Sequence, residues 1–223
     1  MIAIIEVYGE MLVAALGKTL LLTLLSLFFG MIIGMIVALF NVSGNKGLKL
    51  LGNIYVDAVR GVPLIVLAYF VYFGIPAGMK MIGIETFRLS ALQAGTISLS
   101  MNSGAYMAEI FSAGIESIDR GQMEASRSLG LTYGQAMRFV ILPQAVVVMI
   151  PSIINQFIIT LKDTSILSVI GFPELTNTGK TISGNTFKSL ETWAIIGIMY
   201  MVVITILSKT AKRLENKINN GRH

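Results

Sequence analysis

Uncharged residues run without a break from Thr19 to Asn45. A helix needs about 20 mainly apolar residues to cross the hydrocarbon core of a bilayer, so this stretch alone can form a span. Hydrophobic residues make up 54% of the 223 residues and charged residues only 13%, whereas an average soluble domain is about 25% charged. The sequence therefore predicts an all-α integral membrane protein.

Further apolar stretches follow the first, and together they predict about five transmembrane helices. The second is expected to be closed by Gly74-Ile75-Pro76 and the fourth to be interrupted by Pro143 and Pro151. The expected spans are about 19–40, 54–73, 89–110, 139–160 and 192–208. Residues 1–18 are expected to form an interfacial segment, since a secretory signal would begin with bases rather than Glu6 and Glu10. The predicted organisation is this segment, one transmembrane domain at 19–208 and a basic cytoplasmic tail at 209–223.

Basic residues predict that the N-terminus lies outside and the C-terminus in the cytoplasm, because cytoplasmic loops carry an excess of Lys and Arg. With this orientation the cytoplasmic bases are Lys46, Lys49, Arg120, Arg127, Arg138, Lys209, Lys212, Arg213, Lys217 and Arg222. The outer side then has Lys18, Lys80, Arg88, Lys162, Lys180 and Lys188.

The loop at about 116–138, between the third and fourth spans, has the pattern of two capped helices. Asp119 followed by Gln122 resembles a capping box, and Thr132 followed by Gln135 resembles a second one. Gly130 stands between them, where a left-handed residue can end the first helix. Ordered helices outside the membrane indicate a contact surface. A structured interfacial connector would show the same pattern.

Two classes of site are excluded by composition. The chain has no Cys and a single His, His223, so thiolate chemistry and imidazole metal sites are not expected. The segment from Glu174 to Thr181 is similar to a phosphate-binding loop, but Glu174 replaces the first glycine and would repel phosphate. Any ATP that drives this protein must therefore be bound by another chain.

The capped loop resembles the EAA motif of ABC importer permeases. The residues that carry the resemblance are Gly121-Gln122-Met123-Glu124-Ala125-Ser126-Arg127-Ser128-Leu129-Gly130 and, further on, Phe139-Val140-Ile141-Leu142-Pro143-Gln144-Ala145. Ser126 stands in place of the second alanine. The resemblance implies a coupling helix that docks in a cleft of a cytoplasmic ATPase. It assigns this role to Glu124, Ala125, Arg127, Leu129 and Gly130.

Other segments resemble the polar amino-acid permease family, of the histidine, glutamine and arginine type. They are Arg60–Leu64, Tyr72–Pro76, Ala105–Ile110 and Leu161–Ser165. The resemblance implies a permease subunit of an amino-acid importer in the bacterial plasma membrane. Its implied partners are a second permease subunit (the same chain or a sister chain), a cytoplasmic ATPase dimer that binds ATP and Mg²⁺, and an external amino-acid-binding protein. No catalysis and no cofactor are expected in this chain.

Polar side chains within the spans are costly and therefore suggest function. Asp57 and Arg60 lie three residues apart and can pair, either as a structural ion pair or at a pathway that bends near Gly61 and Pro63.

Lys162, Asp163, Thr164 and Ser165 offer donors and acceptors for the ammonium and carboxylate groups of an amino acid, although Lys162 and Asp163 could instead reach the outer interface as a pair. Asn102 and Glu109 are candidates for the same route. The serines of the third span, such as Ser103, can equally join helices by hydrogen bonds.

A transporter driven by an ion gradient is the alternative function. That class commonly shows inverted repeats, and no internal repeat is found in this sequence.

Overall fold

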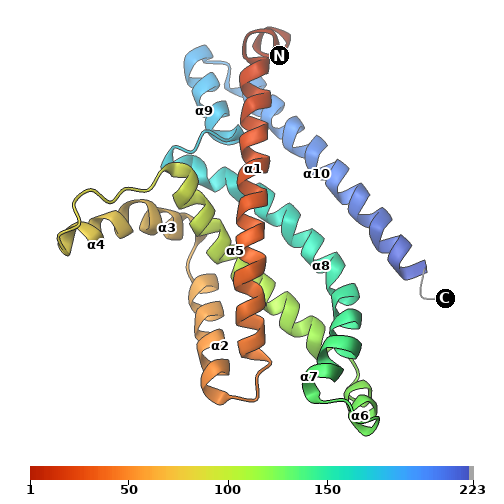
Figure 1. Cartoon of the computed structure of the whole chain (residues 1–223). Coiled ribbons are helices and arrows are strands. Elements are labelled where there is room, and N and C mark those ends of the chain that lie inside the picture. Colours follow the sequence, from red (N-terminus) through yellow and green to blue (C-terminus); the bar gives the residue numbers. More distant parts are fainter. Residues whose placement is uncertain (221–223) are drawn as a thin grey trace.

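The structure is a computed structural model that describes residues 1–220, with side-chain surroundings as far as Arg213. Every regular element in that range is helical, which confirms the all-α prediction. Successive long helices alternate in direction (Figure 1). They are α1 (Ile2–Asn41), α2 (Lys46–Gly61), α5 (Ala91–Glu116), α8 (Leu142–Asp163) and α10 (Ser189–Asn220). Arg222 of the predicted tail and His223 lie outside the described residues.

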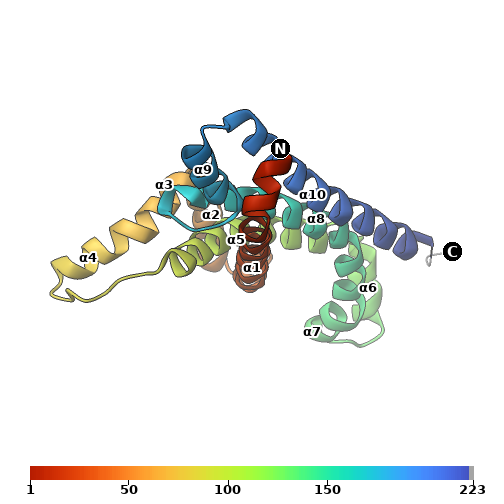
Figure 2. The ribbon, with the colours of Figure 1, turned by 90° about the horizontal axis from the view of Figure 1, so that it is seen from above.

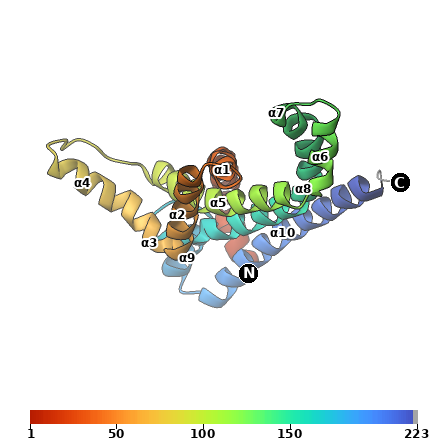
Figure 3. The same cartoon turned by 90° about the horizontal axis from the view of Figure 1, so that it is seen from below.

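Shorter helices connect the long ones. They are α3 (Leu64–Tyr69), α4 (Ile75–Met81), α6 (Arg120–Ser128), α7 (Tyr133–Ala136) and α9 (Leu175–Thr186). Seen from above and from below, the arm formed by α3 and α4 and the loop formed by α6 and α7 extend from opposite ends of the molecule (Figure 2, Figure 3).

The first helix is longer than the sequence predicts. It begins at Ile2 and continues for 40 residues, so residues 2–18 of the predicted interfacial segment form its first turns. At 1.5 Å per residue it measures about 60 Å, roughly twice the thickness of a bilayer core.

The predicted second span, 54–73, is wrong as a single helix. The chain leaves α2 after Gly61, passes through extended Val62 (φ −103°, ψ 128°) and enters α3 after Pro63. Proline disfavours helical backbone in the residue before it, and this explains the break at Val62. The second half of the predicted span therefore turns aside into the arm of α3 and α4 (Figure 1).

The predicted effects of three prolines are wrong: Pro76 does not close a helix, and neither Pro143 nor Pro151 interrupts one, since Pro151 lies inside α8. Pro76 follows a π-helical turn at Phe70–Gly74, and Pro143 follows another at Met137–Ile141. Each of these two prolines is the second residue of the next helix, α4 or α8. The wider hydrogen-bond register of a π-turn accommodates a residue without an N–H, so the helix continues through both sites.

Four helical stretches of the described chain are long and apolar enough to cross a membrane. They are Ile2–Asn41, Leu64–Met81, Tyr133–Ile170 and Ser189–Arg213. α5, which corresponds to the predicted third span, is not one of them. Its buried residues include many small or polar ones, such as Ser98, Asn102 and Ser103, because it packs among α1, α2 and α8 rather than facing lipid.

Small residues bring α1 and α5 into close contact. A Cβ atom added at Gly34 would lie 2.5 Å from the Cβ of Met107 and 3.0 Å from the backbone N of Ala108. The Ser103 hydroxyl donates to the Ser26 carbonyl across the same contact, at 3.4 Å. Close backbone approach through glycine is a common way to pack membrane helices.

Substituting Gly34 should weaken this contact. Gly34→Ala is expected to destabilise the protein by about 1–3 kcal/mol, because the added methyl group overlaps α5. Gly17→Ala is the matched control on the same helix, since a Cβ there meets no atom within 4 Å. Thermal unfolding of the detergent-solubilised protein measures both variants. Equal midpoints for the two would contradict the proposed packing role of Gly34.

Candidate functional site

Local hydrogen bonds cap the start of α6. The Asp119 carboxylate accepts a hydrogen bond from the Gly121 N–H at 2.7 Å, so Asp119 caps the helix as predicted. The expected reciprocal contact from Gln122 is not formed; the Gln122 N–H donates to the Asp119 carbonyl instead.

Gly130 ends α6 in the left-handed conformation, with φ +87°. Its N–H donates to the Arg127 carbonyl at 3.0 Å, and the Leu131 N–H donates to the Ser126 carbonyl at 3.2 Å. This pair of bonds is the Schellman arrangement, which favours glycine. The predicted glycine stop is confirmed.

The second predicted capping box is also confirmed. The Gln135 N–H donates to the Thr132 hydroxyl at 3.3 Å, and the Thr132 N–H donates to the Gln135 amide oxygen at 2.8 Å. Both ends of the turn between α6 and α7 are thus held by local hydrogen bonds.

The fixed turn presents a mixed acidic and apolar surface. Glu124 and Ala125 are exposed, and Leu129 is 85% exposed. Exposed residues on an ordered loop outside the membrane are typical of a contact surface. Ser126, by contrast, is buried, and its hydroxyl donates to the Gln122 carbonyl. Ser126 therefore packs against its own chain.

Arg127 stabilises the turn itself. Its guanidinium donates to the Leu131 carbonyl at 3.1 Å, just beyond Gly130. The side chain thus holds the last turn of α6 against the start of the next segment.

Arg60 pairs with a carboxylate from another helix, not with Asp57 as predicted. Arg60, near the end of α2, forms an ion pair with Glu109 of α5 and lies 5.0 Å from the centre of the Tyr106 ring. Spacing along α2 allowed the Asp57 pairing, but α5 offers a carboxylate directly opposite. The paired side chains remain 38% and 45% exposed, so the ion pair faces the outside of this single chain.

The predicted segment at 162–165 lies at the end of α8. Lys162 is exposed, Asp163 and Ser165 are half-buried, and Thr164 is buried. The Thr164 hydroxyl donates to the Leu161 carbonyl at 2.7 Å. A 3₁₀ turn, Thr164–Ile170, then leads toward α9.

The structure does not bring the two groups of candidate residues together. The 3₁₀ turn that follows the 162–165 segment contacts α5 near its start, where Leu167 packs against Gly95. Arg60 contacts α5 near its other end, at Glu109. These positions are 14 residues apart, or about 21 Å along the helix. Asn102 is buried midway, and its spacing of seven from each places it on the same face of α5. Asn102 and Glu109 thus share one face of α5.

A buried carboxylate that the sequence reasoning missed anchors α9. Glu174 has no exposed surface, and its carboxylate accepts hydrogen bonds from the backbone N–H of Thr176 at 2.8 Å and Asn177 at 2.6 Å. The Tyr200 hydroxyl of α10 donates to it at 2.9 Å. Burial raises the pKa of the Glu174 carboxyl above its ordinary value and outweighs these hydrogen bonds, which lower it.

Other contacts fix the same corner. The Leu175 N–H donates to the Thr19 hydroxyl of α1 at 3.1 Å, and the Lys180 ammonium donates to the Ser168 hydroxyl at 2.8 Å. The segment that is similar to a phosphate-binding loop is therefore the capped start of a structural helix. In the sequence, Pro173 followed by a polar run that can form a helix was the pattern that could have indicated Glu174 as the N-cap of α9.

Comparison with known proteins gives a consistent set of relatives. The family described as the binding-protein-dependent transport system inner membrane component matches residues 30–220. The probable glutamine ABC transporter permease protein GlnM of Bacillus subtilis is 36% identical over 204 residues, 91% of each chain. The glutamine transport system permease protein GlnP of Escherichia coli is 34% identical over 208 residues, 93% of each chain.

A solved structure is similar throughout. The crystal structure of an amino acid ABC transporter with histidines contains a chain that superposes with a TM-score of 0.88. That chain is 37% identical, and the match covers 97% of both chains.

The ion pair between α2 and α5 should be measurable by exchange of charges. Arg60→Glu is expected to lower the thermal midpoint, because it places two carboxylates at one contact. Arg60→Glu combined with Glu109→Arg should restore most of the loss, with a coupling energy of about 0.5–3 kcal/mol. Asp57→Gln is the control. A double variant no more stable than Arg60→Glu would contradict this pairing.

Glu174 should make stability depend on pH. Its raised pKa means that the folded state favours the protonated carboxyl, so its contribution is present at low pH and is lost as the pH rises through that pKa. The thermal midpoint of the wild type, relative to that of Glu174→Gln, should therefore fall as the pH increases above the ordinary glutamate range. A relative midpoint that rises with pH would be the opposite of this expectation.

Proposed function

Because this chain belongs to the family of inner membrane components of binding-protein-dependent transport systems, we propose that it is the permease subunit of an ATP-driven importer of polar amino acids. The names of its relatives support this substrate class. Two relatives are described as glutamine permeases, and the similar solved structure is described as an amino acid ABC transporter with histidines. The family match favours this function over a transporter driven by an ion gradient.

The proposed membrane arrangement has five crossings, by α1, α2 with its arm, α5, α8 and α10, with the N-terminus outside. The alternating directions in Figure 1 support it. In Figure 1 the loop of α6 and α7 and the turn before α2 lie at the lower end of the molecule, and α10 runs downward in the direction of that end. This end carries most of the bases assigned to the cytoplasm, including Lys46, Lys49 and Lys209.

The exposed helix α6, with its capped start and its glycine-stopped end, is the observation that carries the coupling role. We assign Glu124, Ala125 and Leu129 to direct contact with a separate cytoplasmic ATPase, which binds ATP and Mg²⁺. Arg127 and Gly130 then act as positioning residues, since they hold the shape of the turn.

The translocation route is proposed to follow α5. Its residues would be Asn102, Arg60 and Glu109 together with Lys162, Asp163, Thr164 and Ser165 beyond α8. Charged side chains at membrane depth need water or protein around them, and the Arg60–Glu109 pair is half exposed in the single chain. A second permease subunit facing this pair would supply that environment. An external amino-acid-binding protein would deliver the substrate.

Reconstitution in liposomes tests both coupling and substrate. The permease, its ATPase and its binding protein should together accumulate radiolabelled glutamine or histidine when ATP is enclosed on the ATPase side. Gly130→Ala should reduce uptake per ATP hydrolysed, since a side chain at φ +87° costs about 1 kcal/mol or more and reshapes the turn. Gly134→Ala is the matched control, because a Cβ there meets no atom within 4 Å and φ is ordinary.

Two outcomes would overturn the proposal. Uptake driven by a proton or sodium gradient without the ATPase would reject the ATP-driven function. An unchanged ratio of uptake to hydrolysis in both Gly130→Ala and Glu124→Ala would reject the coupling role of this turn.

A further inference from the structure

The ion pair between α2 and α5 has unused hydrogen-bonding capacity. Arg60 and Glu109 form the single ion pair among the residues whose side chains the structure describes. The contact joins one guanidinium nitrogen, Nη1, to one carboxylate oxygen, Oε1. A guanidinium has several N–H donors and a carboxylate has several acceptor positions. Both groups can therefore bind a ligand in addition to each other.

Tyr106 holds the guanidinium in a defined orientation. The centre of its ring lies 5.0 Å from Cζ of Arg60, and cation–π attraction at this distance favours one placement of the side chain. Tyr106 and Glu109 are three residues apart and share a face of α5. The Tyr55 hydroxyl of α2 donates to the Met101 carbonyl of α5 at 2.8 Å, which fixes the two helices beside the pair.

The ion pair is accessible to a polar solute. The Arg60 and Glu109 side chains are 38% and 45% exposed. Charged side chains within a membrane face water or protein rather than lipid. The exposed edges of this pair therefore face a space that water can enter, and a small zwitterion in that water can reach both charges.

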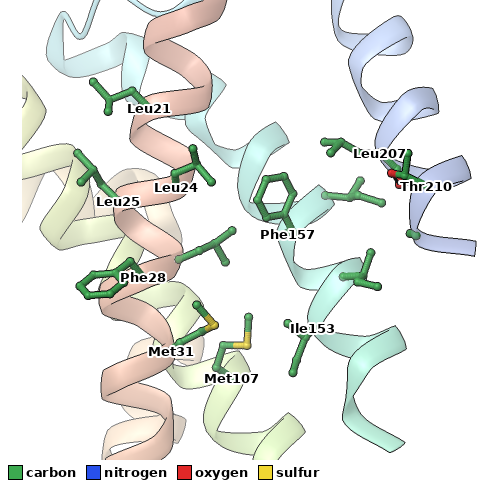
Figure 4. Close-up of a pocket in the computed structure, with 14 residues that line it drawn as sticks. Leu21, Leu24, Leu25, Phe28, Met31, Met107, Ile153, Phe157, Leu207 and Thr210 are labelled. Atoms are coloured by element: carbon green, nitrogen blue, oxygen red, sulfur yellow. Dashed lines mark hydrogen bonds between the residues drawn. The ribbon is translucent and has the colours of Figure 1, made fainter. Parts of the chain in front are cut away.

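The apolar pocket between α1, α8 and α10 does not suit an amino acid. Figure 4 shows lining side chains such as Phe28, Phe157 and Leu207, and Thr210 is the one lining residue with a side-chain oxygen. Its hydroxyl donates within its own helix, to the Leu207 carbonyl at 2.8 Å. An amino acid that entered this pocket would lose the hydration of two charged groups without replacement.

Lys162 and Asp163 cannot hold both charged groups of one amino acid. They are adjacent in sequence at the end of α8, and adjacent residues of a helix do not face each other. The ammonium and carboxylate of an amino acid are bonded to the same carbon, so they need a donor and an acceptor that lie together. Among the described side chains, Arg60 and Glu109 meet this condition.

We propose that Arg60 and Glu109 bind the α-carboxylate and the α-ammonium group of the transported amino acid. The carboxylate accepts hydrogen bonds from the guanidinium of Arg60, whose planar donors match its shape. The ammonium donates to the carboxylate of Glu109. Neither protein charge is left unpaired, because the ligand brings one charge of each sign. Tyr106 acts as a positioning residue for Arg60.

This inference rests on the proposed function and makes it more specific. The substrate is recognised at this position through the two groups that all α-amino acids share. Its side chain is not selected here.

Ligand binding to the purified permease–ATPase complex, without the binding protein, tests the subsite. The probe is radiolabelled glutamine. Two competitors each lack one charged group: γ-aminobutyramide has no α-carboxylate, and glutaramate has no α-ammonium. Each should bind the wild type about tenfold or more weakly than glutamine, because one hydrogen-bonded charge contact is missing. Histidine should displace glutamine, since it has both groups.

Single variants should change the preference in opposite directions. Arg60→Gln should lower the affinity for glutamine about tenfold or more but leave that for γ-aminobutyramide least affected. Glu109→Gln should likewise weaken glutamine but spare glutaramate. A pair with a structural role alone would not produce these opposite preferences. Lys49→Gln on α2 and Glu116→Gln on α5 are the matched controls, since both residues are exposed charges on the same helices.

Further variants separate binding from folding. Arg60→Gln combined with Glu109→Gln leaves no unpaired charge, and it should bind none of the three ligands while thermal unfolding shows a folded protein. Tyr106→Leu should lower the affinity for glutamine about threefold, whereas Tyr106→Phe keeps the ring over the guanidinium and should bind as the wild type does.

Three results would overturn the proposal. Unchanged glutamine binding in the folded double variant would reject the subsite. Equal loss of all three ligands in both single variants would mean that the pair only supports the fold. A complex that takes up another amino acid with ATP, yet binds neither glutamine nor histidine, would reject recognition through the shared groups. This last result leaves the importer function intact, whereas a wild type without ATP-driven uptake of any amino acid would reject that function itself.

Discussion

The close approach of α1 and α5 is the contact on which the rest of the structure depends. Gly34 on α1 leaves room for Met107 and Ala108 of α5, and this fixes α5 in the centre of the bundle. α2, α3 and α8 then pack around α5. In a bilayer the lipid is as apolar as the helices, so association depends on close packing and hydrogen bonds rather than on the hydrophobic effect. A central helix can therefore carry serine and asparagine that a lipid-facing helix could not.

Features that depend on neighbouring residues could be predicted from the sequence. The left-handed Gly130 and the capping box of Thr132 and Gln135 are formed as expected, because the hydrogen bonds involved join residues within five positions of each other. The approximate limits of α5 and α8 were also predicted, whereas α10 continues to Asn220, well beyond the predicted end of the last span at 208. Proline had a less regular effect: Pro63 follows a break, while Pro76 and Pro143 are accommodated after π-turns.

Features that depend on distant residues could not be predicted. Arg60 pairs with Glu109, 49 positions away in sequence, and spacing along α2 indicated only Asp57. Glu174 is buried because α1 and α10 close over it, with Tyr200 as its partner 26 positions on. Its pattern in the sequence instead suggested a defective phosphate site. The candidate route along α5 likewise depends on which face of that helix each neighbour leaves uncovered.

The π-turn at Met137–Ile141 joins α7 to α8 without a loop, so Tyr133–Ile170 forms one continuous helical rod of 38 residues. Such a rod measures about 57 Å. One end adjoins the exposed turn at Leu129 and Gly130, and the other carries Asp163 and the 3₁₀ turn. The exposed turn and the 3₁₀ turn are therefore joined by one unbroken stretch of helical backbone, whereas every other pair of long helices is separated by a loop or a break.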